Sequence, residues 1–129
     1  MNISQLEDDL SEHSFTDDRV LKRSESLGKA FQSRGVSPSQ FRKLYNQIRS
    51  LSRGASSVDT KELRSRLRVF RAQVAYSVGR DQIPEDLKGF LDTSLEKILD
   101  SGDDLADQLR DFVQFLESVY GYYYYHEKS

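Results

Sequence analysis

Apolar side chains recur every three or four residues along most of this chain, and this spacing restricts the folds that it can adopt. The clearest series run through residues 41–51, 63–78, 87–99 and 105–123. Such a repeat places the side chains on one face of an α-helix, whereas a half-buried strand needs strict alternation. No segment combines alternation with hairpin turns. The sequence therefore predicts an all-α protein.

Capping residues mark where the helices begin. Ser37, Pro38 and Gln40 form a capping-box pattern, and Asp59 with Glu62 forms a second one. Pro84 is placed to open another helix, and glycines follow several of the apolar series. We expect helices over residues 17–33, 38–54, 59–78, 84–101 and 103–125. With short connections between them, they predict a compact five-helix bundle.

The first sixteen residues differ from the rest. Residues 1–16 mix Ser, Asp, Glu and Asn without a sustained apolar period, so we expect a disordered or loosely attached N-terminal arm. A chain of 129 residues is too short for two independent cores, so residues 17–129 are predicted to form a single domain. No apolar run could span a bilayer and the N-terminus is acidic, which predicts a cytoplasmic protein without a membrane partner.

Charge is distributed unevenly along the sequence. The net charge is −2, yet residues 35–80 carry ten Lys or Arg against two Asp or Glu, and residues 81–129 carry four against twelve. A basic middle suits contact with a polyanion, and an acidic end suits a basic neighbour.

Two basic stripes are the most informative feature. Arg42, Arg49 and Arg53 share one face of the second expected helix, and Lys61, Arg64, Arg68 and Arg71 repeat at offsets of three, seven and ten on the third. Guanidinium groups suit phosphate oxygens, so we expect the two stripes to project together and to hold nucleic acid without reading its bases. Solubility, or pairing with Asp and Glu, is the alternative explanation. The residues predicted to contact nucleic acid are Arg42, Lys43, Arg49, Arg64, Arg68, Arg71 and Arg80.

The sequence contains few candidate catalytic residues. The chain has no cysteine, no glycine-rich phosphate loop, and two histidines, His13 in the expected arm and His126 near the end. The acidic residues Asp100, Asp103, Asp104, Asp107 and Asp111 fit a helix start with a solvated face, although a carboxylate site for a divalent ion is an alternative. We therefore predict no enzymatic activity, no cofactor and no bound metal.

Aromatic residues crowd the end of the last expected helix. Tyr120, Tyr122, Tyr123, Tyr124 and Tyr125 would cover every side of it, and one bundle cannot bury all of them. Because tyrosine is frequent at contact surfaces, we predict that these residues form a protein interface. The alternative is a terminal helical turn whose exposed rings make only non-specific contacts. Tyr76 either stacks on a base or fills the core, and the core is favoured.

Three segments, in order, resemble the small subunit of type III-A CRISPR (Csm) effector complexes. They are Phe41-Arg42-Lys43, the stretch Arg66 to Arg80 that ends in Ala-Tyr-x-x-Gly-Arg, and Phe112 to Tyr122. The similarity covers about residues 38–125. Two departures are Gly121-Tyr122, where the family tends to carry Ala-Tyr, and the acidity of the fifth expected helix.

The resemblance implies a non-catalytic helical bundle that is present in more than one copy. Such a subunit lies beside the backbone subunits that hold the guide RNA, within a complex that has a Cas10-like large subunit. It helps to hold the target strand and the guide–target duplex, and Arg42, Arg71 and Arg80 are the family-like basic residues. A helical protein-interaction adaptor, whose arginines meet an acidic protein and not RNA, is the alternative function.

Overall fold

The computed structural model describes residues 3–80 and 83–128, and residues 1, 2, 81, 82 and 129 lie outside the description. Its elements are α1 (Ile3–Glu12), α2 (Asp18–Leu21), α3 (Ser24–Ser33), α4 (Pro38–Gly54), η1 (Ala55–Ser57), α5 (Thr60–Gly79), α6 (Glu85–Leu99), η2 (Gly102–Asp104) and α7 (Leu105–Lys128). No strand occurs in these two described ranges, which confirms the all-α prediction.

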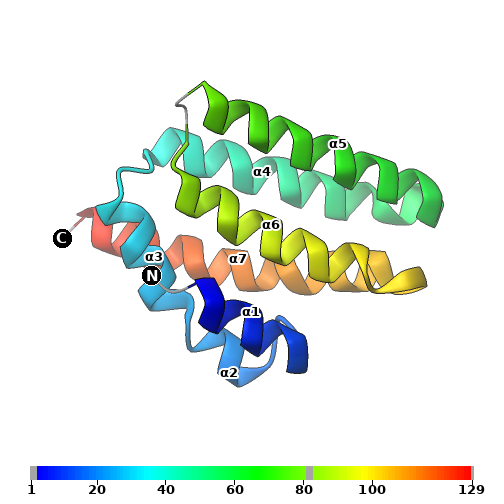
Figure 1. Cartoon of the computed structure of the whole chain (residues 1–129), viewed down its shortest axis with the longest axis horizontal. Helices are drawn as coiled ribbons and strands as arrows, with labels where there is room; N and C mark the ends of the chain where they lie inside the picture. Colours follow the sequence, from blue (N-terminus) through cyan, green and yellow to red (C-terminus); the bar gives the residue numbers. More distant parts are fainter. Residues whose placement is uncertain (1–2, 81–82, 129) are drawn as a thin grey trace.

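Helices α4, α5, α6 and α7 run side by side along the long axis of the molecule (Figure 1). Helix α4 packs on α7, and α5 packs on α6, so the four form the body of the bundle. Helices α3 and α1 cover α7 and α6, respectively. One apolar core joins all of these layers, and its largest members include Phe31, Phe41, Phe90, Phe112 and Tyr123. None of the described helices has the length and apolar character needed to cross a bilayer.

The prediction of five helices preceded by a loose arm needs correction at the N-terminus. Six α-helices of ten or more residues occur in the described part of the chain, because α1 forms within the expected arm. Leu6 and Leu10 lie one turn apart on α1 and are buried. Lys97 of α6 donates to the carbonyl of Leu10 (2.8 Å), and Asp9 forms an ion pair with Arg23. Tertiary packing thus orders a segment whose own apolar pattern is short.

The predicted capping residues act at the starts of α4 and α5. Ser37 accepts a hydrogen bond from the Gln40 backbone N–H (3.2 Å), and the Gln40 side chain accepts one from the Ser37 N–H (3.1 Å), which confirms the first capping box. Asp59 accepts from the Glu62 N–H (2.8 Å). The Glu62 carboxylate pairs with Arg66 (2.9 Å) and does not return to the cap, so the second box forms only in part.

Helices α3 and α7 cross at close range. A Cβ atom added to Gly28 would lie 2.5 Å from the backbone nitrogen of Tyr123 and 2.7 Å from the carbonyl oxygen of Val119. Just beyond α3, Gly35 takes a positive φ of 87°, and the following Val36 carbonyl accepts a hydrogen bond of 2.6 Å from the buried Tyr123 hydroxyl. Backbone contact and this hydrogen bond together fix α3 on the C-terminal half of α7.

Candidate nucleic-acid interface

Helix α4 carries a positive charge that the molecule does not neutralise. Its charged residues are Arg42, Lys43, Arg49 and Arg53, and it contains no Asp or Glu. All four side chains are exposed, and within the described part of the chain no carboxylate lies within ion-pair distance of them. These cations therefore remain available to an external anion.

Three of these cations lie along the side of α4 that faces α7. The Arg42 Nε donates to the Tyr120 hydroxyl at 3.5 Å, and this hydrogen bond raises the pKa of Arg42. Arg49 and Arg53 lie near Tyr45, whose ring packs 5.2 Å from that of Tyr120. Burial raises the pKa of the Tyr45 phenol, so its hydroxyl stays neutral beside the arginines. Lys43 lies on the other side of α4, where it faces α5.

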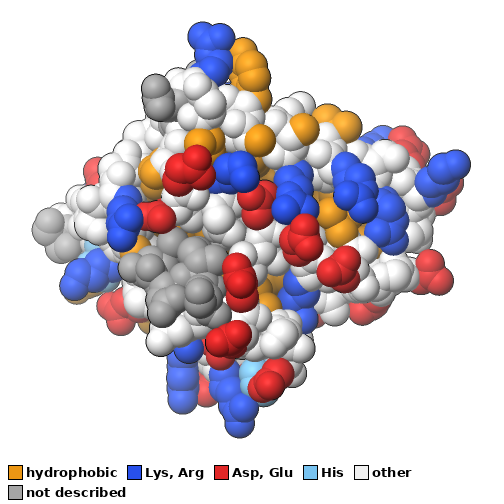
Figure 2. All heavy atoms as spheres, in the orientation of Figure 1, with side chains coloured by type: hydrophobic (Ala, Val, Ile, Leu, Met, Phe, Trp, Pro, Cys, Tyr) orange, Lys and Arg blue, Asp and Glu red, His pale blue; other side chains and the backbone are white. Residues whose placement is uncertain are grey.

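Arg71 of α5, by contrast, is partly exposed and forms ion pairs within the protein. Its Nε lies 3.0 Å from the Asp92 carboxylate and its Nη1 lies 2.7 Å from that of Glu96, both on α6. The hydrogen bond to Glu96, followed by that to Asp92, raises the pKa of Arg71. Lys88 also reaches Asp92 (2.6 Å). Acidic and basic side chains consequently alternate over the face formed by α5 and α6 (Figure 2).

Arg64 has a structural role at the end of α6. Its Nη1 donates to the carbonyl of Leu99 (2.7 Å) and its Nη2 donates to that of Gly102 (3.2 Å). The last carbonyls of a helix have no partner within the helix, and a cation there also opposes the negative end of the helix dipole. Arg64 therefore caps α6.

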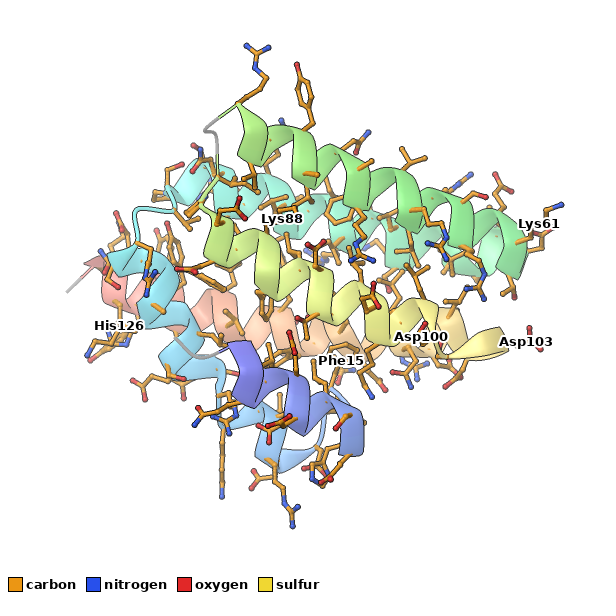
Figure 3. All side chains as sticks on the ribbon, in the orientation of Figure 1. Phe15, Lys61, Lys88, Asp100, Asp103 and His126 are labelled. Atoms are coloured by element: carbon orange, nitrogen blue, oxygen red, sulfur yellow. The ribbon has the colours of Figure 1, made fainter. Side chains whose placement is uncertain are left out.

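The expectation that the two basic stripes project together is wrong. Arg42 contacts α7, whereas Arg64 and Arg71 contact α6, so the stripes lie on opposite flanks of the pair formed by α4 and α5. Of the α5 stripe, Lys61 and Arg68 are exposed and have no ion pair with any described residue. Lys61 stands at the end of α5 that lies at the same end of the bundle as Asp103 (Figure 3).

The end of α5 presents an aromatic ring to solvent. Tyr76 is 63% exposed, which overturns the prediction that it fills the core. Arg80 is also exposed, and its Nη1 donates to the Tyr76 hydroxyl (3.1 Å) while its Cζ lies 5.7 Å from the ring centroid. The sequence does carry the signal, because Tyr76 is out of phase with the apolar series that ends at Val74 and Val78.

The family model described as Csm2 Type III-A matches residues 16–129. This chain belongs to the Csm2 family. It is thus a small subunit of a type III-A CRISPR Csm complex, as the resemblance predicted. No curated protein and no solved structure matches the chain significantly. Helix α1 of this Csm2 chain precedes the matched residues.

The tyrosine run of this Csm2 chain divides into core and surface. Tyr123 is fully buried, so its assignment to a protein interface is wrong. Tyr120 is half-buried and stacks on Phe41 with centroids 5.0 Å apart. Tyr122, Tyr124 and Tyr125 are the exposed members, and their role at an interface stays a prediction. A helix places consecutive residues on different faces, which separates these roles.

The acidic residues near the start of α7 contact side chains that are close to them in the sequence. Arg110 lies 3.3 Å from Asp107 and 3.8 Å from Asp111, and Gln108 donates to Asp104 (3.3 Å). Over the described residues, no group of three or more His, Asp or Glu side chains is arranged to hold a metal ion. The positions of these carboxylates thus agree with a solvated helix start.

The two ion pairs of Arg71 lead to a prediction about the stability of the protein. We expect Arg71→Gln to lower the free energy of unfolding by about 1 kcal/mol, because Asp92 and Glu96 lose a charged hydrogen-bond donor in a partly exposed setting. Arg68→Gln, on the same stripe but unpaired, should change it by less than about 0.5 kcal/mol. Urea unfolding followed by circular dichroism measures both. Equal stability of the two variants would contradict the structural role of Arg71.

Proposed function

We propose that this Csm2 subunit binds the target RNA strand and the guide–target duplex, without sequence preference, through the exposed cations of α4. The observation that carries the proposal is that Arg42, Lys43, Arg49 and Arg53 share one helix that contains no acidic residue. Arg80, beside Tyr76 at the end of α5, adds a cation on the side of α4 where Lys43 lies, and Arg68, on the opposite flank, is a separate candidate. Arg64 and Arg71 do not belong to it, because α6 occupies their guanidinium groups.

The spacing of the α4 arginines suits a strand that lies along the helix. At about 1.5 Å of rise per residue, Arg42 and Arg49 are roughly 10 Å apart along the axis, and Arg53 follows about 6 Å further. Guanidinium groups bind phosphate oxygens in a forked geometry, and contacts to phosphate carry no base information. Binding through this surface is consequently electrostatic and weakens as salt increases.

Other surfaces of the subunit serve its protein partners in this proposal. The exposed Tyr122, Tyr124 and Tyr125 offer apolar rings with hydroxyls that tolerate water, and the acidic start of α7 suits a basic neighbour. We assign these surfaces to the backbone subunits, the Cas10-like large subunit and further copies of the chain. The complex acts in the cytoplasm, and the subunit itself performs no catalysis.

The test removes the charge of the α4 arginines in a reconstituted complex. We expect Arg42→Gln, Arg49→Gln and Arg53→Gln together to weaken target-RNA binding at least about tenfold at moderate salt, and to reduce the slope of log affinity against log salt by about 2, as expected for three lost phosphate contacts to single-stranded RNA. Filter binding over a salt series gives both quantities.

The matched control replaces three exposed cations elsewhere. Lys22, Lys29 and Arg110 lie on or beside other helices, and their change to glutamine should leave affinity and slope unaltered. If the α4 variant binds RNA like the wild type, the proposal fails. If instead the α4 variant fails to join the complex, the arginines serve a protein partner, which is the adaptor function.

A further inference from the structure

A pocket of about 500 Å³ lies between α4 and α5, beside the exposed ring of Tyr76. It is one end of a longer groove, because a second pocket of about 850 Å³ between the same helices shares part of its lining. The residues common to both are Lys43, Gln47, Phe70 and Gln73. A volume of this size lies within the range of roughly 300 to 1,000 Å³ that small-ligand sites occupy.

The lining of the pocket combines amides with an apolar floor. Gln40, Gln47 and Gln73 supply side-chain amides, and Leu44 and Val74 supply apolar surface. The Gln40 oxygen already accepts from the Ser37 N–H, but all three amides offer N–H donors and Gln47 and Gln73 also offer acceptors, so the wall can meet polar edges of different patterns. A flat ligand with polar edges matches this composition.

Charge distinguishes this pocket from the other hollows of the molecule. Lys43 is its charged lining residue, and no carboxylate belongs to the described lining. The pocket between α4 and α7 includes Glu117 beside Arg42, the one between α1 and α6 includes Asp92 and Glu96, and the second pocket between α4 and α5 includes Glu62. A ligand that carries phosphate therefore meets no carboxylate of the described lining in the pocket beside Tyr76.

The Tyr76 ring offers a stacking surface at the edge of this pocket. The ring is 63% exposed, and the guanidinium of Arg80 lies against it. Proteins that bind single-stranded nucleic acid commonly stack a base on an exposed aromatic ring beside basic residues. In a paired duplex the faces of internal bases are covered, so a base that reaches this ring must be unpaired.

We propose that the pocket between α4 and α5 takes one unpaired nucleobase of the bound RNA, stacked on Tyr76. Lys43 and Arg80 contact the phosphates on either side of that base, and the glutamine amides meet its polar edge without selecting a particular base. This inference rests on the proposed RNA-binding function and adds a site for a base to a surface that otherwise contacts phosphate.

The test uses the full-length chain and a short single-stranded RNA that contains 2-aminopurine, whose fluorescence is quenched when it stacks. At low ionic strength, the wild type should quench the fluorescence on binding. Tyr76→Ala should abolish the quenching and weaken binding about tenfold, which is the usual size of one base–aromatic stack. Tyr76→Phe keeps the ring and should retain both properties.

Gln114→Ala is the control, because Gln114 is also exposed but lies on α7 and does not line this pocket. It should quench and bind like the wild type. An RNA of the same length whose positions are all abasic should bind wild type and Tyr76→Ala equally. Equal quenching by wild type and Tyr76→Ala overturns the inference. Because α4 charge removal is measured separately, the base site can fail while phosphate binding by α4 stands.

Discussion

Replacing Gly28 by alanine is expected to lower the free energy of unfolding by at least about 3 kcal/mol, the upper part of the range for overpacking a core. The added Cβ would meet the backbone nitrogen of Tyr123 at 2.5 Å and the backbone oxygen of Val119 at 2.7 Å. These atoms belong to the α7 backbone and cannot rotate away as a side chain can. Helices α3 and α7 must then separate along their crossing.

Thermal unfolding measures this effect, and a loss of that size should lower Tm by about 10 °C. Gly121→Ala is the matched control, because Gly121 also lies in a helix at this end of the molecule and a Cβ there would meet nothing within 4 Å. Alanine favours the helix over glycine, so this variant should gain roughly 0.5 to 1 kcal/mol. A Gly28→Ala variant as stable as the wild type would contradict the close crossing.

Replacing Tyr123 by phenylalanine is expected to cost about 2 kcal/mol at pH 7, because it leaves the buried Val36 carbonyl without its donor. The ring keeps its contacts with Phe41 and Tyr120, so the hydroxyl alone is tested. Urea unfolding measures the difference. Tyr122→Phe, in which the lost hydroxyl belongs to an exposed side chain, should match the wild type.

The same hydroxyl should make stability fall at alkaline pH. Burial raises the pKa of Tyr123 to about 12, whereas the unfolded chain ionises near the ordinary tyrosine value of about 10. The contribution is therefore complete below pH 10 and is lost as the pH rises from 10 to 12, because only the unfolded state then releases the proton. Wild type and Tyr123→Phe should converge over this interval, and a constant difference between them would contradict the buried phenol.

The helices of the bundle body could be predicted from the sequence because their signals are local. Ser37 and Gln40 cap α4 whatever surrounds them, and the long apolar series fixes the buried face of each helix. Helix α1 could not be predicted in this way. It offers Leu6 and Leu10 in a polar segment, and the surface of α6 that buries them is more than eighty residues away in the sequence.

The candidate site was predictable in composition but not in arrangement. Spacing places Arg64, Arg68 and Arg71 on one face of α5, yet it does not say which helix lies opposite that face. Asp92 and Glu96 meet Arg71 only after α5 and α6 pack together. The positive charge of α4 could be predicted from the sequence alone, since a helix without Asp or Glu cannot neutralise its own arginines.

Tyr76 and Tyr123 show that helical phase was more informative than residue type. Both were assigned by their aromatic character, one to the core and the other to the surface, and the structure exchanges them. Tyr123 lies four residues after the buried Val119 and continues that series. Tyr76, by contrast, is out of phase with the buried residues of α5.

The crossing of α3 and α7 affects how the protein folds during translation. Gly28 emerges from the ribosome about ninety residues before Val119, the nearer end of its contact surface. At synthesis rates of roughly 5 to 20 residues per second, α3 waits about 5 to 20 s for its partner. During this interval Leu27 and Phe31, which the finished fold buries, have no α7 to cover them. Folding of this subunit is therefore completed only after α7 has been synthesised.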